Sequence, residues 1–133
     1  MIGYATLGTN DFAKGRAFYD ALLGELGAKR IMEFGDDISG FTMWGTTWDK
    51  PALALTNPHN KQPATAGNGT MVALVVDDRA KVDTLHAKAL ALGGTCEGPP
   101  GLRGDEGPQA FYGAYFRDLD GNKLCAFRTG PVS

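Results

Sequence analysis

The sequence predicts an α+β fold made of two βαβββ modules, which form a mixed, curved sheet with the helices outside. Strand-like and helix-like segments follow the order β-α-β-β-β twice along the chain. The two halves also resemble each other at a fixed offset. Finally, the chain closes with a hairpin whose side chains alternate between two faces.

The first module begins with a strand over residues 2–8, and Asp11 is a suitable N-cap for the helix that follows. Apolar side chains recur at helical spacing over residues 12–26, and Gly27 ends this helix. The remaining expected segments are strands at 29–34, 39–44 and 52–56 and a loop at 57–69.

The second module repeats this order, with a strand at 70–76 and a helix at 79–92 that Asp77 or Asp78 caps. A short strand at 95–97 and a long loop at 98–108 follow. The closing hairpin spans residues 111–127, with Gly121 in its turn and with Cys125 and Phe127 on one face.

The internal repeat is visible without gaps, because residues 4–27 align with residues 71–94 at an offset of 67. The alignment pairs Tyr4 with Met71, and the last strands of the two modules pair Ala54 with Cys125. We therefore expect a single domain over residues 1–133. Its parts are module 1 at about 1–57, a linker at 58–69 and module 2 at about 70–128.

Composition excludes several classes of protein. The formal net charge is −2 and no basic run occurs, so no nucleic-acid partner is expected. No apolar stretch has membrane-spanning length and no signal peptide is visible, so no membrane partner is expected. The two cysteines are too few for a disulfide framework, which predicts a reduced, cytoplasmic protein.

Four segments carry a resemblance to a known family: YATLGTNDFAKGRAFYDALLG, GNGTMVALVV, ALALGGTCEGPPGLR and FYGAYFRDLDGNKLCAF. Together they resemble the vicinal oxygen chelate superfamily, which includes glyoxalase I, bleomycin-resistance proteins and extradiol dioxygenases. In that family each module curls into a half-barrel around a cavity, and modules pair within one chain or between two. The resemblance therefore implies a small-molecule ligand and a homodimer.

The resemblance also implies where a metal would bind. Enzymes of the family hold a divalent metal with His, Glu or Gln from the first and last strands of each module. The corresponding positions here are Tyr4, Ala54, Met71 and Cys125. Because these donors suit no hard cation, we expect no metal and no cofactor. A metal recruited through Cys125, Tyr4 and other donors is the alternative.

A set of aromatic, sulfur-containing and basic residues is expected to bind the ligand. Arg103 lies in a Gly-flanked segment and is either an anion-binding residue or a surface charge. Cys125 is either a nucleophile or a buried, inert thiol. We expect His59 and His86 to be partly exposed and without a catalytic role. The expected ligand-binding residues are Tyr4, Trp44, Met71, Arg103, Tyr112, Tyr115 and Cys125.

Three functions are compatible with the sequence. The first is a binding protein of the superfamily that lacks the usual metal ligands and holds a small, partly aromatic or anionic molecule. The second is a glyoxalase- or dioxygenase-type enzyme, a lyase or oxidoreductase, with non-standard metal ligands or a metal-free mechanism. The third is a structural homologue with a filled cavity. Missing metal ligands favour the first over the second, and the small residues Ala54, Ala73 and Gly113 favour it over the third.

Overall fold

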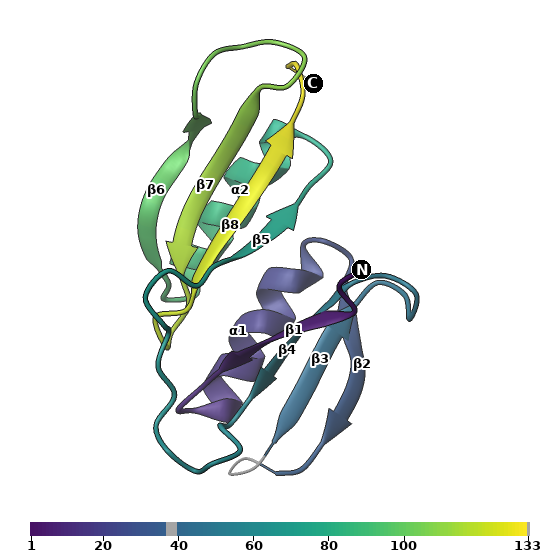
Figure 1. Cartoon of the computed structure of the whole chain (residues 1–133), viewed down its shortest axis with the longest axis vertical. Helices are drawn as coiled ribbons and strands as arrows, with labels where there is room; N and C mark the ends of the chain where they lie inside the picture. Colours follow the sequence, from purple (N-terminus) through teal and green to yellow (C-terminus); the bar gives the residue numbers. More distant parts are fainter. Residues whose placement is uncertain (37–39, 133) are drawn as a thin grey trace. The chain divides into compact units, whose positions relative to one another are not determined.

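A computed structural model describes residues 1–36 and 40–132 of the chain, which form two compact units (Figure 1). Unit 1 consists of residues 1–68 together with residues 119–122. Unit 2 consists of residues 69–118 and the chain from residue 123 onward. Each unit contains one helix and one four-stranded sheet, which confirms the α+β class and the two βαβββ modules.

Unit 1 carries a mixed sheet with the strand order β1-β4-β3-β2. β1 and β4 run parallel, whereas β4, β3 and β2 are joined by antiparallel pairing. The helix α1 packs on β2, β3 and β4, so one face of the sheet is covered by the helix of its own unit. The elements are β1 (Tyr4–Gly8), α1 (Phe12–Gly24), β2 (Lys29–Phe34), β3 (Phe41–Gly45) and β4 (Ala52–Thr56).

Unit 2 has the same plan, with the strand order β5-β8-β7-β6 and a parallel pair formed by β5 and β8. Its helix α2 packs on β6, β7 and β8. In Figure 1, α2 lies behind this sheet, so the view looks onto the face that carries no helix of the unit. The elements are β5 (Val72–Val75), α2 (Arg79–Ala91), β6 (Thr95–Leu102), β7 (Phe111–Arg117) and β8 (Lys123–Thr129).

The strand registers confirm the internal repeat. Thr6 pairs with Ala54 across β1 and β4, and Ala73 pairs with Cys125 across β5 and β8. Thr6 and Ala73 are separated by the same offset of 67 that aligns the two halves of the sequence. Ala54 and Cys125 therefore occupy equivalent places, as the sequence alignment predicts.

Local chemistry explains where both helices begin and end. The carboxylate of Asp11 accepts a hydrogen bond from Lys14 N at 3.1 Å, and that of Asp78 accepts one from Lys81 N at 2.8 Å. Asp78, rather than Asp77, is thus the second N-cap. Gly27, with φ +75°, turns the chain away just after α1, a conformation that glycine adopts without steric cost.

The predicted loop at 98–108 is wrong in its first part, because β6 continues to Leu102. β6 is an edge strand, and Pro99 and Pro100, which lack N–H groups, fall where its pairing with β7 is interrupted. Its register with β7 shifts between Cys96 and Gly98 and again between Gly98 and Gly101. These irregularities hide the strand from a search for simple alternation.

Other boundaries move by a few residues: α1 ends at Gly24 and β5 begins at Val72. The predicted strand at 39–44 is β3, which starts at Phe41, and the predicted residue 39 lies outside the described residues. No helix in the described part of the chain has the length and apolar character needed to cross a membrane.

Candidate functional site

The uncovered face of the second sheet brings together four side chains, Arg103, Tyr115, Lys123 and Cys125, which we call the Arg103 cluster. Tyr115 and Cys125 are direct cross-strand partners on β7 and β8. The Arg103 guanidinium carbon lies 5.4 Å from the centre of the Tyr115 ring, and the Lys123 Nζ lies 5.4 Å from the same point. Two cations therefore share one aromatic ring, an arrangement that concentrates positive charge beside a phenol.

Backbone carbonyls, rather than carboxylates, hold Arg103 in place. In the described part of the chain its guanidinium donates to Pro99 O at 2.7 Å and to Gly101 O at 3.0 Å. The bulged course of β6 creates this position, because it turns the two carbonyls toward the guanidinium. A guanidinium that is anchored by neutral acceptors keeps its full positive charge available to a ligand.

Two glycines of β6 leave the room that Arg103 occupies. A Cβ at Gly98 would lie 3.1 Å from Arg103 Nη2 and 3.0 Å from the Tyr115 ring. A Cβ at Gly101 would lie 3.4 Å from Arg103 Nη1, which is an ordinary contact. Gly98 is therefore the position where an added methyl group would disturb the guanidinium and the ring together.

The buried thiol of Cys125 forms the floor of the cluster. Cys125 is 1% exposed, and burial raises the pKa of its thiol. This pKa is lowered by a hydrogen bond with Tyr115 and by the positive charges of Arg103 and Lys123. Burial has the larger effect, so the net shift of the pKa is upward. At neutral pH the thiol stays protonated and uncharged, so it does not cancel the positive charge above it.

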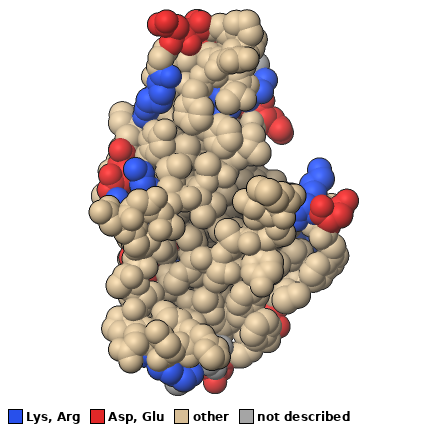
Figure 2. All heavy atoms as spheres, viewed as in Figure 1, with Lys and Arg blue, Asp and Glu red and all other residues tan. Residues whose placement is uncertain are grey.

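The charge near the cluster is positive on balance. Arg117 Nε donates to Glu97 Oε1 at 2.7 Å, and the charge of Lys123 also lowers the pKa of Glu97, after the larger effect of Arg117. Two cations thus act on the Glu97 carboxylate, and Arg103 adds a third positive charge to the cluster. Figure 2 shows few charged side chains on this face of the unit, with basic and acidic ones next to each other along the β6 edge.

Three of the residues predicted from sequence, Arg103, Tyr115 and Cys125, are brought together in the cluster. Lys123 was not identified from the sequence. Lys123 lies two residues before Cys125 in β8, so the two side chains project from the same face of the sheet. Met71 lies just before β5, two residues from Ala73, the partner of Cys125, and is 42% exposed.

Tyr112 and Trp44, two predicted site residues, face the helices instead. The Tyr112 hydroxyl donates to Asp83 Oδ1 of α2 at 2.7 Å, and Arg79 stacks on its ring. The Trp44 indole N–H donates to Asp20 Oδ1 of α1 at 2.8 Å, and the side chain is 2% exposed. Both rings belong to the helix-facing layers of their sheets.

Tyr4 belongs to an aromatic group on the sheet of unit 1. It is 55% exposed, and its ring meets that of Phe41 edge to face at 6.3 Å. Phe41 in turn stacks on Phe34 at 4.8 Å, and Phe34 is 60% exposed. This group gives unit 1 an exposed apolar surface, which was visible in the sequence only as isolated aromatic residues.

One argument for an open cavity fails. Gly113 was expected to leave space, but a Cβ there would lie 2.6 Å from Phe111 Cε1. The Phe111 ring covers this glycine and stacks on Phe127 at 5.3 Å. Gly113 therefore makes room for an aromatic side chain of the protein itself.

Three of the four positions that the resemblance implies for a metal carry poor donors for a hard divalent cation. Ala54 is fully buried and has no donor atom, and the Cys125 thiol is held in its neutral form. Met71 supplies only a soft thioether. Within residues 1–36 and 40–132, no three His, Cys, Asp or Glu side chains are grouped to hold a metal ion.

Comparisons with known proteins agree with this fold. The family model described as "Glyoxalase/Bleomycin resistance protein/Dioxygenase superfamily" matches residues 1–126. A glyoxalase/bleomycin resistance protein from Albidiferax ferrireducens T118 is 36% identical, with a TM-score of 0.81 over 96% of this chain and 98% of that one.

More distant structures share the fold alone. A glyoxalase/bleomycin resistance protein/dioxygenase family enzyme from Burkholderia phytofirmans PsJN is 22% identical, with a TM-score of 0.70, covering 95% of this chain and 96% of that one. A lactoylglutathione lyase from Agrobacterium tumefaciens is 20% identical, with a TM-score of 0.63, covering 96% of this chain and 92% of that one. The search of curated proteins finds no match.

Proposed function

Because the chain belongs to the glyoxalase/bleomycin resistance protein/dioxygenase superfamily, we propose that it binds a small organic anion at the Arg103 cluster without a divalent metal. The observation that carries this proposal is the convergence of Arg103 and Lys123 on the Tyr115 ring. The ligand would place a carboxylate, sulfonate or phosphate against the guanidinium and an aromatic or apolar portion along the neighbouring rings.

Charge and hydrogen-bonding capacity support this assignment. Arg103 uses two of its guanidinium nitrogens on main-chain oxygens and still presents a positive edge. The stacked pair Phe111 and Phe127 lies on the same face as Tyr115 and Cys125 by strand parity, and offers apolar surface to the rest of the ligand.

An enzyme of the lyase or dioxygenase type needs donors or a base at the implied metal positions. Of the side chains there, Ala54 supplies neither, and Met71 offers only a soft thioether. We therefore place binding, for sequestration or sensing, ahead of catalysis.

We also propose that the protein is a cytoplasmic homodimer. Both cysteines are free thiols, as expected in a reducing compartment. Exposed apolar side chains on the sheets, Phe34 at 60% and Val75 at 68%, provide surface that a second copy would cover. Native mass spectrometry with elemental analysis of the purified protein reads oligomeric state, bound molecule and metal together.

The test of the binding site uses anilinonaphthalene sulfonate as an aromatic anion, with uncharged aminonaphthalene as the comparison. Arg103→Ala should weaken sulfonate binding by about 1.5–3 kcal/mol, the range for hydrogen bonds to charged groups. It should leave aminonaphthalene binding nearly unchanged. Gly98→Ala should weaken sulfonate binding too, since its Cβ would displace the guanidinium.

Lys88→Ala supplies the matched control, because it removes one positive charge from α2, which packs on the other face of the same sheet. It should leave sulfonate affinity unchanged. If the wild type, Arg103→Ala and Lys88→Ala bound anilinonaphthalene sulfonate with equal affinity, the Arg103 cluster would not be the binding site.

A further inference from the structure

A thiol and an imidazole meet on the helix side of the second sheet, away from the face that carries the Arg103 cluster. Cys96 Sγ of β6 lies 3.3 Å from His86 Nε2 of α2. Cys96 pairs with Phe116, which is fully buried. His86 was expected to have no catalytic role, and only ten positions across a helix end separate it from Cys96 in the sequence.

The two members of this thiol–imidazole pair differ in exposure. Cys96 is exposed, whereas His86 is only 7% exposed, contrary to the expectation of a partly exposed histidine. The edge of the imidazole packs against the Phe116 ring, with ring centres 6.4 Å apart. The protein thus fixes the base while the thiol stays open to solvent, which is the geometry of an activated nucleophile.

Burial, rather than a neighbouring charge, keeps the imidazole neutral. Burial lowers the pKa of His86, and the charge of Asp83, one turn earlier on α2, opposes this only in part. Asp83 is itself engaged by the Tyr112 hydroxyl of β7. From β6 the facing group is the Cys96 thiol. A neutral imidazole has a free lone pair that can accept the thiol proton.

We propose that Cys96 is a nucleophilic thiol that forms mixed disulfides with low-molecular-weight disulfides, and that His86 Nε2 accepts its proton. The electron pair of the Cys96 sulfur forms the new S–S bond as the S–S bond of the small disulfide breaks. One half of the reagent leaves as a thiolate, which takes up the proton from His86. Cys96 is oxidised to the mixed disulfide, and the departing half of the reagent is reduced to a free thiol.

Cys125 provides an internal comparison for this reaction. It is 1% exposed, and its surroundings are two cations and a phenol rather than a base. The proposal does not depend on the proposed ligand site, because Cys96 and Cys125 lie on opposite faces of the sheet. If the Arg103 cluster bound no anion, the proposal for Cys96 would therefore be unaffected.

The experiment follows the reaction of the folded protein with dithiodipyridine, and with cystamine as an aliphatic disulfide, across pH. The wild type should consume one equivalent rapidly, and peptide mapping should find the modification on Cys96. Cys96→Ser should lose the rapid phase and Cys125→Ser should keep it. His86→Gln should react at least about tenfold more slowly near neutral pH, because the base that accepts the thiol proton is removed.

The pH profile of the wild type tests the proposal without any variant. The rate should fall in acidic solution below about pH 6.5, because an imidazole that has taken up a proton cannot accept one from the thiol. His86→Gln should lose this step. Equal labelling of Cys96 and Cys125, or an unchanged rate and pH profile in a folded His86→Gln protein, would overturn the proposal.

Discussion

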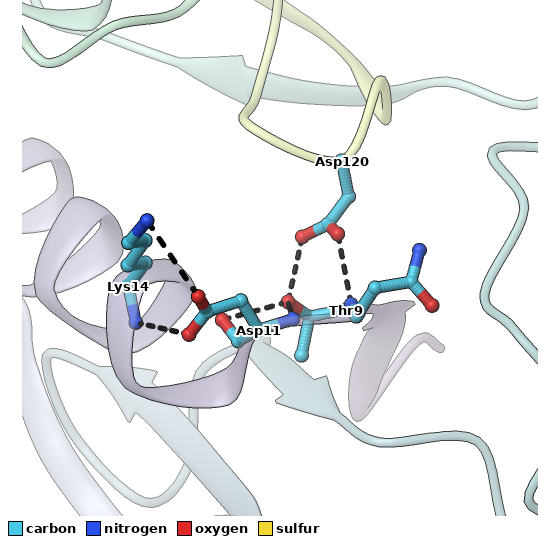
Figure 3. Close-up of polar contacts among 5 residues, drawn as sticks. Thr9, Asp11, Lys14 and Asp120 are labelled. Atoms are coloured by element: carbon cyan, nitrogen blue, oxygen red, sulfur yellow. Dashed lines mark hydrogen bonds and ion pairs between the residues drawn. The ribbon is translucent and has the colours of Figure 1, made fainter.

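Asp120, in the turn between β7 and β8, accepts a hydrogen bond from the hydroxyl of Thr9, which directly follows β1, at 2.6 Å (Figure 3). Its second carboxylate oxygen accepts from Asn10 N at 2.8 Å. Asn122 of the same turn donates to Gly8 O at 2.9 Å. These bonds explain why residues 119–122 belong to unit 1 although the strands that they join belong to unit 2.

Loss of the Asp120 carboxylate should destabilise the protein. Thr9 is fully buried, so Asp120→Ala removes the charged acceptor of a desolvated hydroxyl. We expect the free energy of unfolding to fall by about 1–3 kcal/mol, measured by urea denaturation. Lys14→Ala is the control, because the Lys14–Asp11 pair in Figure 3 is exposed and 3.9 Å long. That change should cost less than about 1 kcal/mol, and equal effects of the two variants would contradict the assigned role of Asp120.

The fold was predictable because its signals are local. Helix periodicity and the caps Asp11 and Asp78 depend on neighbouring residues alone, and both appear in the structure. The repeat is visible because the two halves align without a gap. β6 was only partly predictable. Its length depends on pairing with β7, and its bulges and two prolines break the alternation that marks a strand.

The site was less predictable, because it depends on which face of each strand meets a helix. Tyr112 and Tyr115 are three residues apart and must point to opposite faces, so strand parity shows that only one of them can join the site. Arg103 follows β6, and the register shifts of this strand place its guanidinium beside the Tyr115 ring. The meeting of Cys96 with His86 depends on how α2 packs, which no local pattern encodes.

Two glycines of α1 should respond in opposite ways to alanine. A Cβ at Gly15 would lie 2.8 Å from Leu55 Cδ2 and 3.0 Å from Thr9 Oγ1, so these two buried side chains must shift. Gly15→Ala should therefore lower the free energy of unfolding by about 1–3 kcal/mol despite better helix propensity. A Cβ at Gly24 meets nothing within 4 Å, and Gly24→Ala should stabilise the protein by up to about 1 kcal/mol. Thermal and urea unfolding of both variants measure this, and stabilisation by Gly15→Ala would show that the helix is not in close contact there.

Stability should depend on His86 in mildly acidic solution. Burial lowers the pKa of His86 in the folded chain below the value of about 6.5 expected when unfolded. Between those two values the unfolded chain binds more protons, so the free energy of unfolding rises with pH. The stabilisation is complete above about pH 6.5 and is lost as the pH falls toward the lowered folded value.

Urea unfolding between about pH 5 and 7.5 isolates this effect, because the carboxylates whose pKa is lowered have unfolded pKa values near 4. These carboxylates are Asp20, Asp49, Glu97 and Glu106. The wild type should lose stability across this range as the solution is acidified, whereas His86→Gln should give a nearly flat profile. His59→Gln removes a histidine from the exposed loop at 57–69 and should keep the wild-type slope. If His86→Gln retained the full slope, the imidazole would be free to take up a proton in the folded protein. In that event the buried, neutral base described beside Cys96 would not exist.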